Sequence, residues 1–205
     1  ITVSNALREC MLQQGFSPEK IKTIYDGIEI DGTLDEQKFL SPIKEKLNVA
    51  CVGQLSQLKG QEILIEAIAK MSEQERSCFK FDFYGDFLPG ERNRIIKKVN
   101  RFHLENQIHF KGHSKYISKI LPFYDIGIQP SHSEGFSRVT VEYMASGLCV
   151  IAEEEGAIPE LIQNKEQGLL YHCFDSSELK DLLLYCYNNQ KEMLEMANNA
   201  QDKAH

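Results

Sequence analysis

Two glutamates, Glu134 and Glu142, lie in one stretch of the chain with seven residues between them. Glu134 belongs to a small polar loop, and Glu142 lies within the helix that the sequence predicts after that loop. A loop carboxylate accepts hydrogen bonds from hydroxyl groups, and the free N–H groups at a helix N-terminus attract phosphate. The pattern therefore favours a pocket for an anionic ligand rich in hydroxyls, and a nucleotide sugar has both features.

The same loop and the start of the helix supply further candidate groups. Gly135 lets the backbone approach a ligand closely, and Ser137 is a residue type that often caps a helix. The N–H groups of Phe136 and Val139 extend the row of donors, and Arg138 adds a positive charge. The plainer alternatives are two solvated acids, a helix cap and a surface arginine. The occurrence of all these groups in one stretch favours a ligand site. For Arg138, a contact with the ligand and an exposed position on the surface are equally compatible with the sequence.

The elements that must position these groups follow a regular alternation. Short apolar runs predict strands at 48–52, 79–84, 107–110, 126–128, 149–152 and 168–171. Amphipathic stretches predict helices at 61–71, 91–102, 116–123, 158–162, 176–188 and 191–200, and another helix follows Glu134 and ends at Gly147. This alternation predicts an α/β fold with a doubly wound, Rossmann-like parallel sheet of six strands. Ligands of such sheets bind beyond the carboxyl ends of the strands, where the Glu134 loop lies.

The first forty or so residues do not fit this repeat. Ser4 is a good cap for a helix at 4–14, residues 22–25 read as a strand, and 31–41 as a polar linker. The chain looks cut at both ends, because no clear start or stop signal is present there.

Composition excludes several classes of function. A formal net charge of −7 over 205 residues argues against a nucleic-acid partner. No apolar run reaches membrane-spanning length, and no secretory signal is visible. The six cysteines are scattered without a CxxC pair, so we expect reduced, buried thiols and no metal ligands. The run 153–155 of three glutamates reads as a charged loop.

Several further segments occur in a recognisable order. They are 3–7 with 20–28, 52–60, 110–112 with 124–131, the Glu134 and Glu142 pair, 147–152, and 158–162 with 168–171. In these segments the chain resembles the C-terminal half of the retaining glycosyltransferases of family 4, which have the two-domain GT-B fold. The resemblance covers nearly the whole chain. It implies that 1–41 is the end of the N-terminal domain with the interdomain linker, and that 42–205 is the nucleotide-sugar-binding domain.

The resemblance also implies roles for individual residues. Glu134 would be the catalytic residue that orients the donor sugar, and Glu142 would bind the ribose hydroxyls. His113 and Ser114 would bind the nucleobase. The donor sugar and diphosphate would be bound by Gln54, Lys59, Gly135, Phe136, Ser137, Arg138 and Val139.

One departure from the family pattern concerns the diphosphate. Gln54 stands where the family usually has an arginine, whereas the family's lysine is kept as Lys59. Glutamine still donates hydrogen bonds to phosphate but brings no charge. Two consequences remain open, namely a lower affinity for the donor or a diphosphate that depends more on Lys59, Arg138 and the helix N–H groups.

The implied activity is that of a retaining hexosyltransferase. It would move a sugar from a UDP- or GDP-sugar, without a cofactor, to a glycan or lipid-linked acceptor such as a bacterial surface polysaccharide. The acceptor would bind the missing N-terminal domain, so the isolated chain should be inactive. We expect a cytoplasmic enzyme, with peripheral contact at the inner face of the membrane left open.

Two alternatives remain from the sequence. The chain would be a non-catalytic nucleotide-sugar-binding subunit that needs a separate N-domain, or part of a nucleotide-sugar 2-epimerase with the same fold. A plain Rossmann dehydrogenase is disfavoured, because no GxGxxG follows the first strand.

Overall fold

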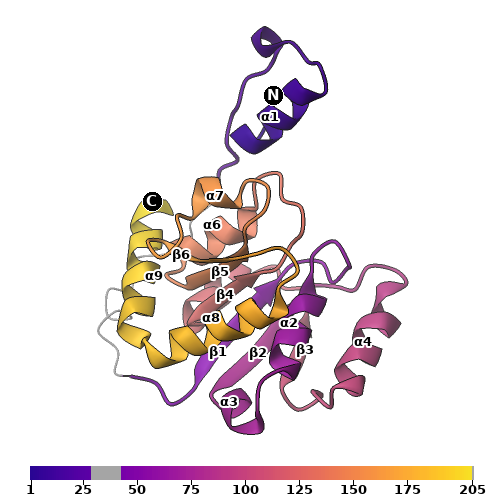
Figure 1. The fold of residues 1–205 in the computed structure, drawn as a ribbon, viewed down its shortest axis with the longest axis vertical. Coiled ribbons are helices and arrows are strands. Elements are labelled where there is room, and N and C mark those ends of the chain that lie inside the picture. Colours follow the sequence, from indigo (N-terminus) through magenta and orange to yellow (C-terminus); the bar gives the residue numbers. More distant parts are fainter. Residues whose placement is uncertain (29–42, 205) are drawn as a thin grey trace.

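Six parallel strands form a single sheet in the order β3-β2-β1-β4-β5-β6 in this computed structural model, which describes residues 1–28 and 43–204 (Figure 1). The strands are β1 Leu47–Val52, β2 Phe79–Tyr84, β3 Ile108–Gly112, β4 Ile126–Gln129, β5 Cys149–Glu153 and β6 Gly168–Tyr171. Every neighbouring pair runs parallel. The predicted α/β fold with a doubly wound, six-stranded parallel sheet is confirmed.

Helices cover both faces of this sheet. The helices of the described residues are α1 Asn5–Gln13, α2 Gln61–Ala69, α3 Glu73–Ser77, α4 Glu91–Arg101, α5 Ile117–Ile120, α6 Arg138–Ala145, α7 Ile158–Leu161, α8 Ser176–Asn188 and α9 Gln190–Ala204, with 3-10 turns at Pro18–Lys20 and Leu121–Phe123. Helix α1 is not part of the cover of the sheet (Figure 1). One apolar cluster, here called the α2/α8 core, lies between the sheet and α2, α4 and α8. A second cluster, the α6 core, lies on the opposite face with α6 and α7.

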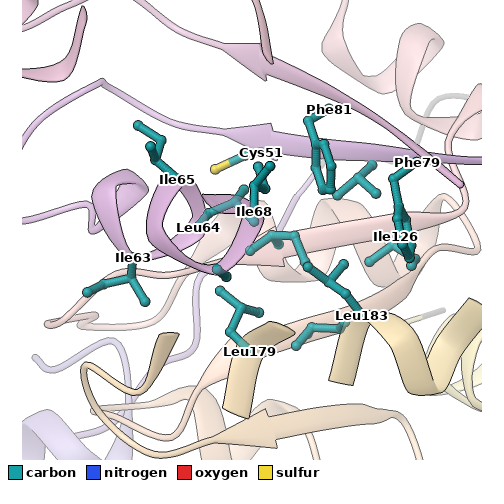
Figure 2. Packing of buried hydrophobic residues seen from close by; sticks show 14 of the residues in the cluster. Cys51, Ile63, Leu64, Ile65, Ile68, Phe79, Phe81, Ile126, Leu179 and Leu183 are labelled. Carbon is teal, nitrogen blue, oxygen red and sulfur yellow. The ribbon is translucent and has the colours of Figure 1, made fainter. Parts of the chain in front are cut away.

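Strand β1 shows why both faces need a helical cover. Val49 and Cys51 belong to the α2/α8 core, which Figure 2 shows in part, whereas Ala50 belongs to the α6 core. Successive side chains of a strand point to opposite faces, and all three residues are at most 1% exposed. Such continuous apolar runs are typical of parallel strands that are buried on both sides.

Helix α9 takes part in both cores. Met193 and Met196 lie in the α2/α8 core, and Ala200 lies in the α6 core. The helix contacts α6, α8, β5 and β6. It therefore runs past β6, the edge strand of the sheet, from one face of the sheet to the other.

Residues 1–28 stand clear of the sheet, near the end that carries α7 (Figure 1). The predicted cap of α1 is confirmed, because the Ser4 hydroxyl oxygen accepts a hydrogen bond from the N–H of Leu7 at 3.1 Å. The predicted strand at 22–25 is wrong, since only an isolated bridge joins Thr2 to Thr23. The predicted linker at 31–41 lies outside the described residues.

Two local differences from the sequence prediction have simple causes. Helix α3 was not predicted, because its five residues show no apolar period; a capping box formed by Ser72 and Glu75 holds it. The single helix expected at 116–123 is instead α5 followed by a 3-10 turn that contains Pro122. Proline lacks the N–H that would continue an α-helix.

The sequence misplaced Glu153 and two of the cysteines. Glu153 ends β5 and is 0% exposed, so the charged-loop interpretation of 153–155 is wrong for this residue. All six cysteines are free, but Cys10 and Cys173 are exposed rather than buried. Within the described part of the chain, no helix combines the length and apolarity that a membrane crossing requires.

Candidate ligand site

Two adjoining pockets open where β1 and β4 end. Both are lined by Val52 at the end of β1 and by Gly53 after it, and Gln129, the last residue of β4, lines the first pocket. β1 and β4 are neighbours in the sheet but are not consecutive in the chain. Their carboxyl ends therefore form the topological switch point, where doubly wound sheets bind ligands.

The first pocket has a volume of about 450 Å³. It brings together seven of the residues that the sequence analysis selected, from the loop after β1, the loop after β4 and helix α6. These are Lys59, Glu134, Phe136, Ser137, Arg138, Val139 and Glu142. Gly135 lies within the same loop but does not line the pocket.

The Glu134 carboxylate is held by two donors. Its Oε1 accepts hydrogen bonds from Lys59 Nζ at 2.7 Å and from Gln129 Nε2 at 2.6 Å. The side chain of Glu134 is 9% exposed and that of Lys59 38%. Both bonds end on the same oxygen, and no other described residue bonds to Oε2, which can accept a hydrogen bond from a ligand hydroxyl.

The loop that carries Glu134 is packed tightly on both sides. A Cβ added to Gly60 would lie 1.7 Å from the Pro130 carbonyl oxygen, and one added to Gly156 would lie 2.4 Å from the Glu134 carbonyl oxygen. That carbonyl also accepts a hydrogen bond from Ala157 N–H at 3.1 Å. Only glycine fits these approaches, and the backbone at Glu134 is therefore fixed from two directions.

Ser137 precedes α6 in an unusual conformation. Its φ is 71°, in the left-handed region, and its side chain makes no capping bond. Its hydroxyl pairs instead with that of Thr140 at 2.8 Å. Arg138 and Val139 then begin the helix, and N–H groups at these positions have no partner inside a helix. This start of α6 is suited to an anion.

Glu142 and Arg138 are the charged groups that α6 places in the first pocket. Burial raises the pKa of Glu142, and the nearby positive charge of Arg138 opposes that effect. Glu142 is half-buried. A carboxylate in such a setting gains from a ligand that donates hydrogen bonds to it.

The second pocket, of about 270 Å³, lies on the side of β2 and β3. Its lining includes His113 and Ser114, which follow β3, together with Gln54. Gln54 lines this second pocket and not the first, so the structure does not bring it together with the other residues expected to bind the diphosphate. A Cβ on Gly85 would lie 2.0 Å from the Gly53 carbonyl oxygen, so the loops after β1 and β2 touch here.

Sequence reasoning missed several residues of the first pocket. Gln129 is 4% exposed, and its side chain donates a hydrogen bond to Glu134. The feature of the sequence that could have identified it is a polar residue at the end of a buried strand. Val3 and Asp26 also line the pocket. The ring of Tyr25 lies 5.8 Å from that of Phe136. The segment 1–28 therefore borders this pocket, which its distance along the chain does not indicate.

Comparison with known proteins gives a family match. The family model described as glycosyl transferases group 1 matches residues 34–203. The chain is 28% identical over 192 residues to the amylovoran biosynthesis glycosyltransferase AmsK of Erwinia amylovora. The aligned region covers 90% of this chain and 46% of that protein. The chain spans about half the length of the curated relatives it matches.

Solved structures show the same architecture. The structure of Anabaena Alr3699/HepE with UDP matches 99% of this chain and 57% of its own, at 28% identity and a TM-score of 0.87. The same protein has also been solved with UDP-glucose. The C-terminal domain of LpcC, a glycosyl transferase group 1 family protein of Francisella tularensis, matches 84% of this chain and 91% of its own, at 27% identity and a TM-score of 0.71.

Proposed function

This chain belongs to the glycosyl transferases group 1 family, and on that premise we propose that it is the donor-binding half of a retaining hexosyltransferase. The donor is a nucleoside-diphosphate sugar, with UDP or GDP as the nucleotide. The acceptor is a glycan or a lipid-linked glycan, bound by the other half of a two-domain enzyme.

A single observation carries the proposal, namely the pair of adjoining pockets at the switch point of the sheet. The first pocket contains carboxylates, a lysine, an arginine and a helix start, which suit a sugar, a diphosphate and a ribose. The second contains His113 and Ser114 and is joined to the first through Val52 and Gly53. One extended nucleotide sugar would occupy both.

The reaction breaks the bond between the anomeric carbon and the diphosphate, so negative charge develops on the leaving phosphate oxygen. Lys59, Arg138 and the first N–H groups of α6 would stabilise that charge where it develops. Glu134 would orient the sugar by accepting a hydrogen bond from one of its hydroxyls. The acceptor hydroxyl oxygen would then form the new bond to the anomeric carbon, and its proton would pass to the departing phosphate oxygen.

The relatives support the choice of substrates. Anabaena Alr3699/HepE has been solved with UDP and with UDP-glucose, and AmsK of Erwinia amylovora is named for amylovoran biosynthesis. We propose a UDP-sugar as the first donor to test. Because the chain covers about half of such relatives, we propose that it binds donor without transferring sugar by itself.

The first test is a thermal-unfolding series of the 205-residue chain with UDP, GDP, ADP, TDP, CMP and NAD. A ligand that binds only the folded state raises the unfolding midpoint with the logarithm of its concentration. We expect a selective rise with one nucleoside diphosphate and none with NAD. The absence of any rise at millimolar ligand would overturn the proposed donor site.

Two further assays separate the alternatives in a protein that joins this chain to an acceptor-binding domain. Transfer to an acceptor supports the proposed enzyme. Donor binding without turnover would instead indicate a binding subunit. A change of configuration in the sugar without any acceptor would indicate a 2-epimerase.

A further inference from the structure

A second group of ionisable side chains lies beside the β4–α6 loop, outside the two pockets. The Glu153 carboxylate, which is 0% exposed, lies 2.9 and 3.0 Å from Nδ1 of His132 through its two oxygens. Cys173 Sγ donates to Glu153 Oε1 at 2.9 Å. The three residues come from the loop after β4, the end of β5 and the segment after β6.

These are three of the ligand types that bind zinc in proteins. One ligand atom from each residue lies within 4.8 Å of the other two. A tetrahedral zinc site with bonds of about 2.0–2.3 Å would separate its ligand atoms by about 3.3–3.6 Å. The carboxylate contacts of 2.9 Å would therefore lengthen by only about 0.5 Å around a central ion.

The charge around Glu153 favours a cation. Among the described residues its ion-pair partner is His132, and Glu154 and Glu155 follow it directly. A divalent cation would be a charged partner for this buried carboxylate.

Tyr171, the last residue of β6, is the register partner of Glu153 in the sheet and is 0% exposed. The Glu153 carboxylate therefore lies in a closed part of the molecule, where a charge needs a partner.

We propose that His132 Nδ1, the Glu153 carboxylate and Cys173 Sγ form a zinc site with three protein ligands and a water in the fourth position. Binding would release the thiol proton of Cys173, because the thiolate is the ligand. The exposed position of Cys173 gives the ion a path from solvent. The proposal does not depend on the donor site.

The ion would fasten the loop that carries Glu134. His132 lies two residues before Glu134, and its ring packs against that of Phe174 with centroids 4.1 Å apart and planes tilted by 40°. Zinc would join this loop to β5 and to the segment after β6. We therefore expect it to raise the unfolding midpoint of the chain with or without nucleotide.

Cobalt titration of the metal-free chain, without an affinity tag, tests the proposal. Tetrahedral Co²⁺ with a thiolate ligand gives visible bands and a thiolate charge-transfer band. We expect one Co²⁺ per chain, displaced by one Zn²⁺, and loss of the charge-transfer band in Cys173→Ser.

His132→Gln should weaken Co²⁺ binding at least tenfold. Cys10→Ser and His172→Ala, which alter exposed residues, should bind like the wild type.

Two results would overturn the site. One is a wild-type chain that shows no thiolate charge-transfer band at stoichiometric Co²⁺, and this does not depend on whether a variant folds. The other is a band that persists in Cys173→Ser while circular dichroism shows the native fold.

Discussion

At the scale of single residues, the contact between Lys59 and Glu134 is the most informative. The Lys59 ammonium group donates a hydrogen bond to the Glu134 carboxylate at 2.7 Å. A diphosphate would compete with Glu134 for Lys59. We infer that donor binding exchanges this ion pair for a lysine–phosphate contact, which leaves the carboxylate to Gln129 and the sugar.

The substitution Glu134→Gln separates the role of Glu134 in sugar transfer from its effect on nucleotide binding through Lys59. The amide keeps the shape of the side chain but removes its charge, so we expect sugar transfer by the proposed two-domain enzyme to fall about 10²–10³-fold. Binding of the nucleoside diphosphate should be unchanged or tighter, because Lys59 is released. Turnover assays and calorimetry with the same preparation measure both, with the exposed Glu105→Gln as control. Equal loss of binding and turnover would contradict the role assigned to Glu134.

Lys59→Met should act on binding itself. A hydrogen bond to a charged group contributes about 1.5–3 kcal/mol, so the affinity for UDP should fall about ten- to hundredfold. The wild-type affinity should also decrease as salt is added, and the variant's should decrease less. Calorimetric titration checks both. Lys97→Met, on the exposed side of α4, is the matched control. An unchanged affinity would exclude Lys59 from the diphosphate site.

At the scale of elements, α6 holds β1 and β4 together at the switch point. The Tyr143 hydroxyl accepts a hydrogen bond from Val52 N–H at 2.7 Å and donates one to the Ile128 carbonyl at 3.3 Å. The Tyr143 ring packs against Gly127, where an added Cβ would lie 2.4 Å from the ring. The helix that carries Glu142 is thereby fixed to the two strands that form the pocket floor.

Gly127→Ala should therefore destabilise the fold. The buried ring of Tyr143 would have to move, and overpacking of this kind costs about 1–3 kcal/mol. Urea unfolding should show a lower midpoint with an unchanged slope. Gly27→Ala is the control, since an added Cβ there meets nothing within 4 Å. Equal stability of the two variants would contradict the packing argument.

The elements themselves were largely predictable from the sequence, because each buried strand is a short apolar run and each long helix has an apolar face. The switch-point loops could be placed for the same reason. Gln129 could not be recognised, since its contact with Glu134 depends on how the loop folds back. The grouping of His132, Glu153 and Cys173 was also hidden, because strand order and not spacing brings them together.

At the scale of the whole molecule, Glu160 connects the segment 1–28 to the sheet domain. Its carboxylate accepts hydrogen bonds from Asn5 N–H at 3.0 Å, Ala6 N–H at 2.7 Å and the Tyr25 hydroxyl at 2.8 Å. These bonds cap the start of α1 from outside the segment. Since Val3 and Asp26 line the first pocket, this contact also sets the shape of that pocket.

Acid should release this contact. Burial acts to raise the pKa of Glu160, but the bonds from Ala6, Tyr25 and Asn5 outweigh it and hold the pKa below its usual value. A lowered pKa in the docked state means that the contact is fully present above about pH 4.3 and is lost as the pH falls through the lowered pKa.

The amide shifts of Asn5 and Ala6, followed by NMR against pH, test this expectation. They should share a midpoint below about 4.3, and Glu160→Gln should abolish the transition. A midpoint at or above the ordinary glutamate value would show that the carboxylate is not held by these donors.

The path of α9 past the edge strand β6 has a consequence for the synthesis of the protein. All six strands leave the ribosome before Gln190–Ala204, yet these residues supply side chains to both cores. Neither apolar face of the nascent sheet can be closed until this helix emerges. Growing chains should therefore bind chaperones until α9 has been made, and ribosome-bound chains that stop at residue 189 should remain sensitive to protease.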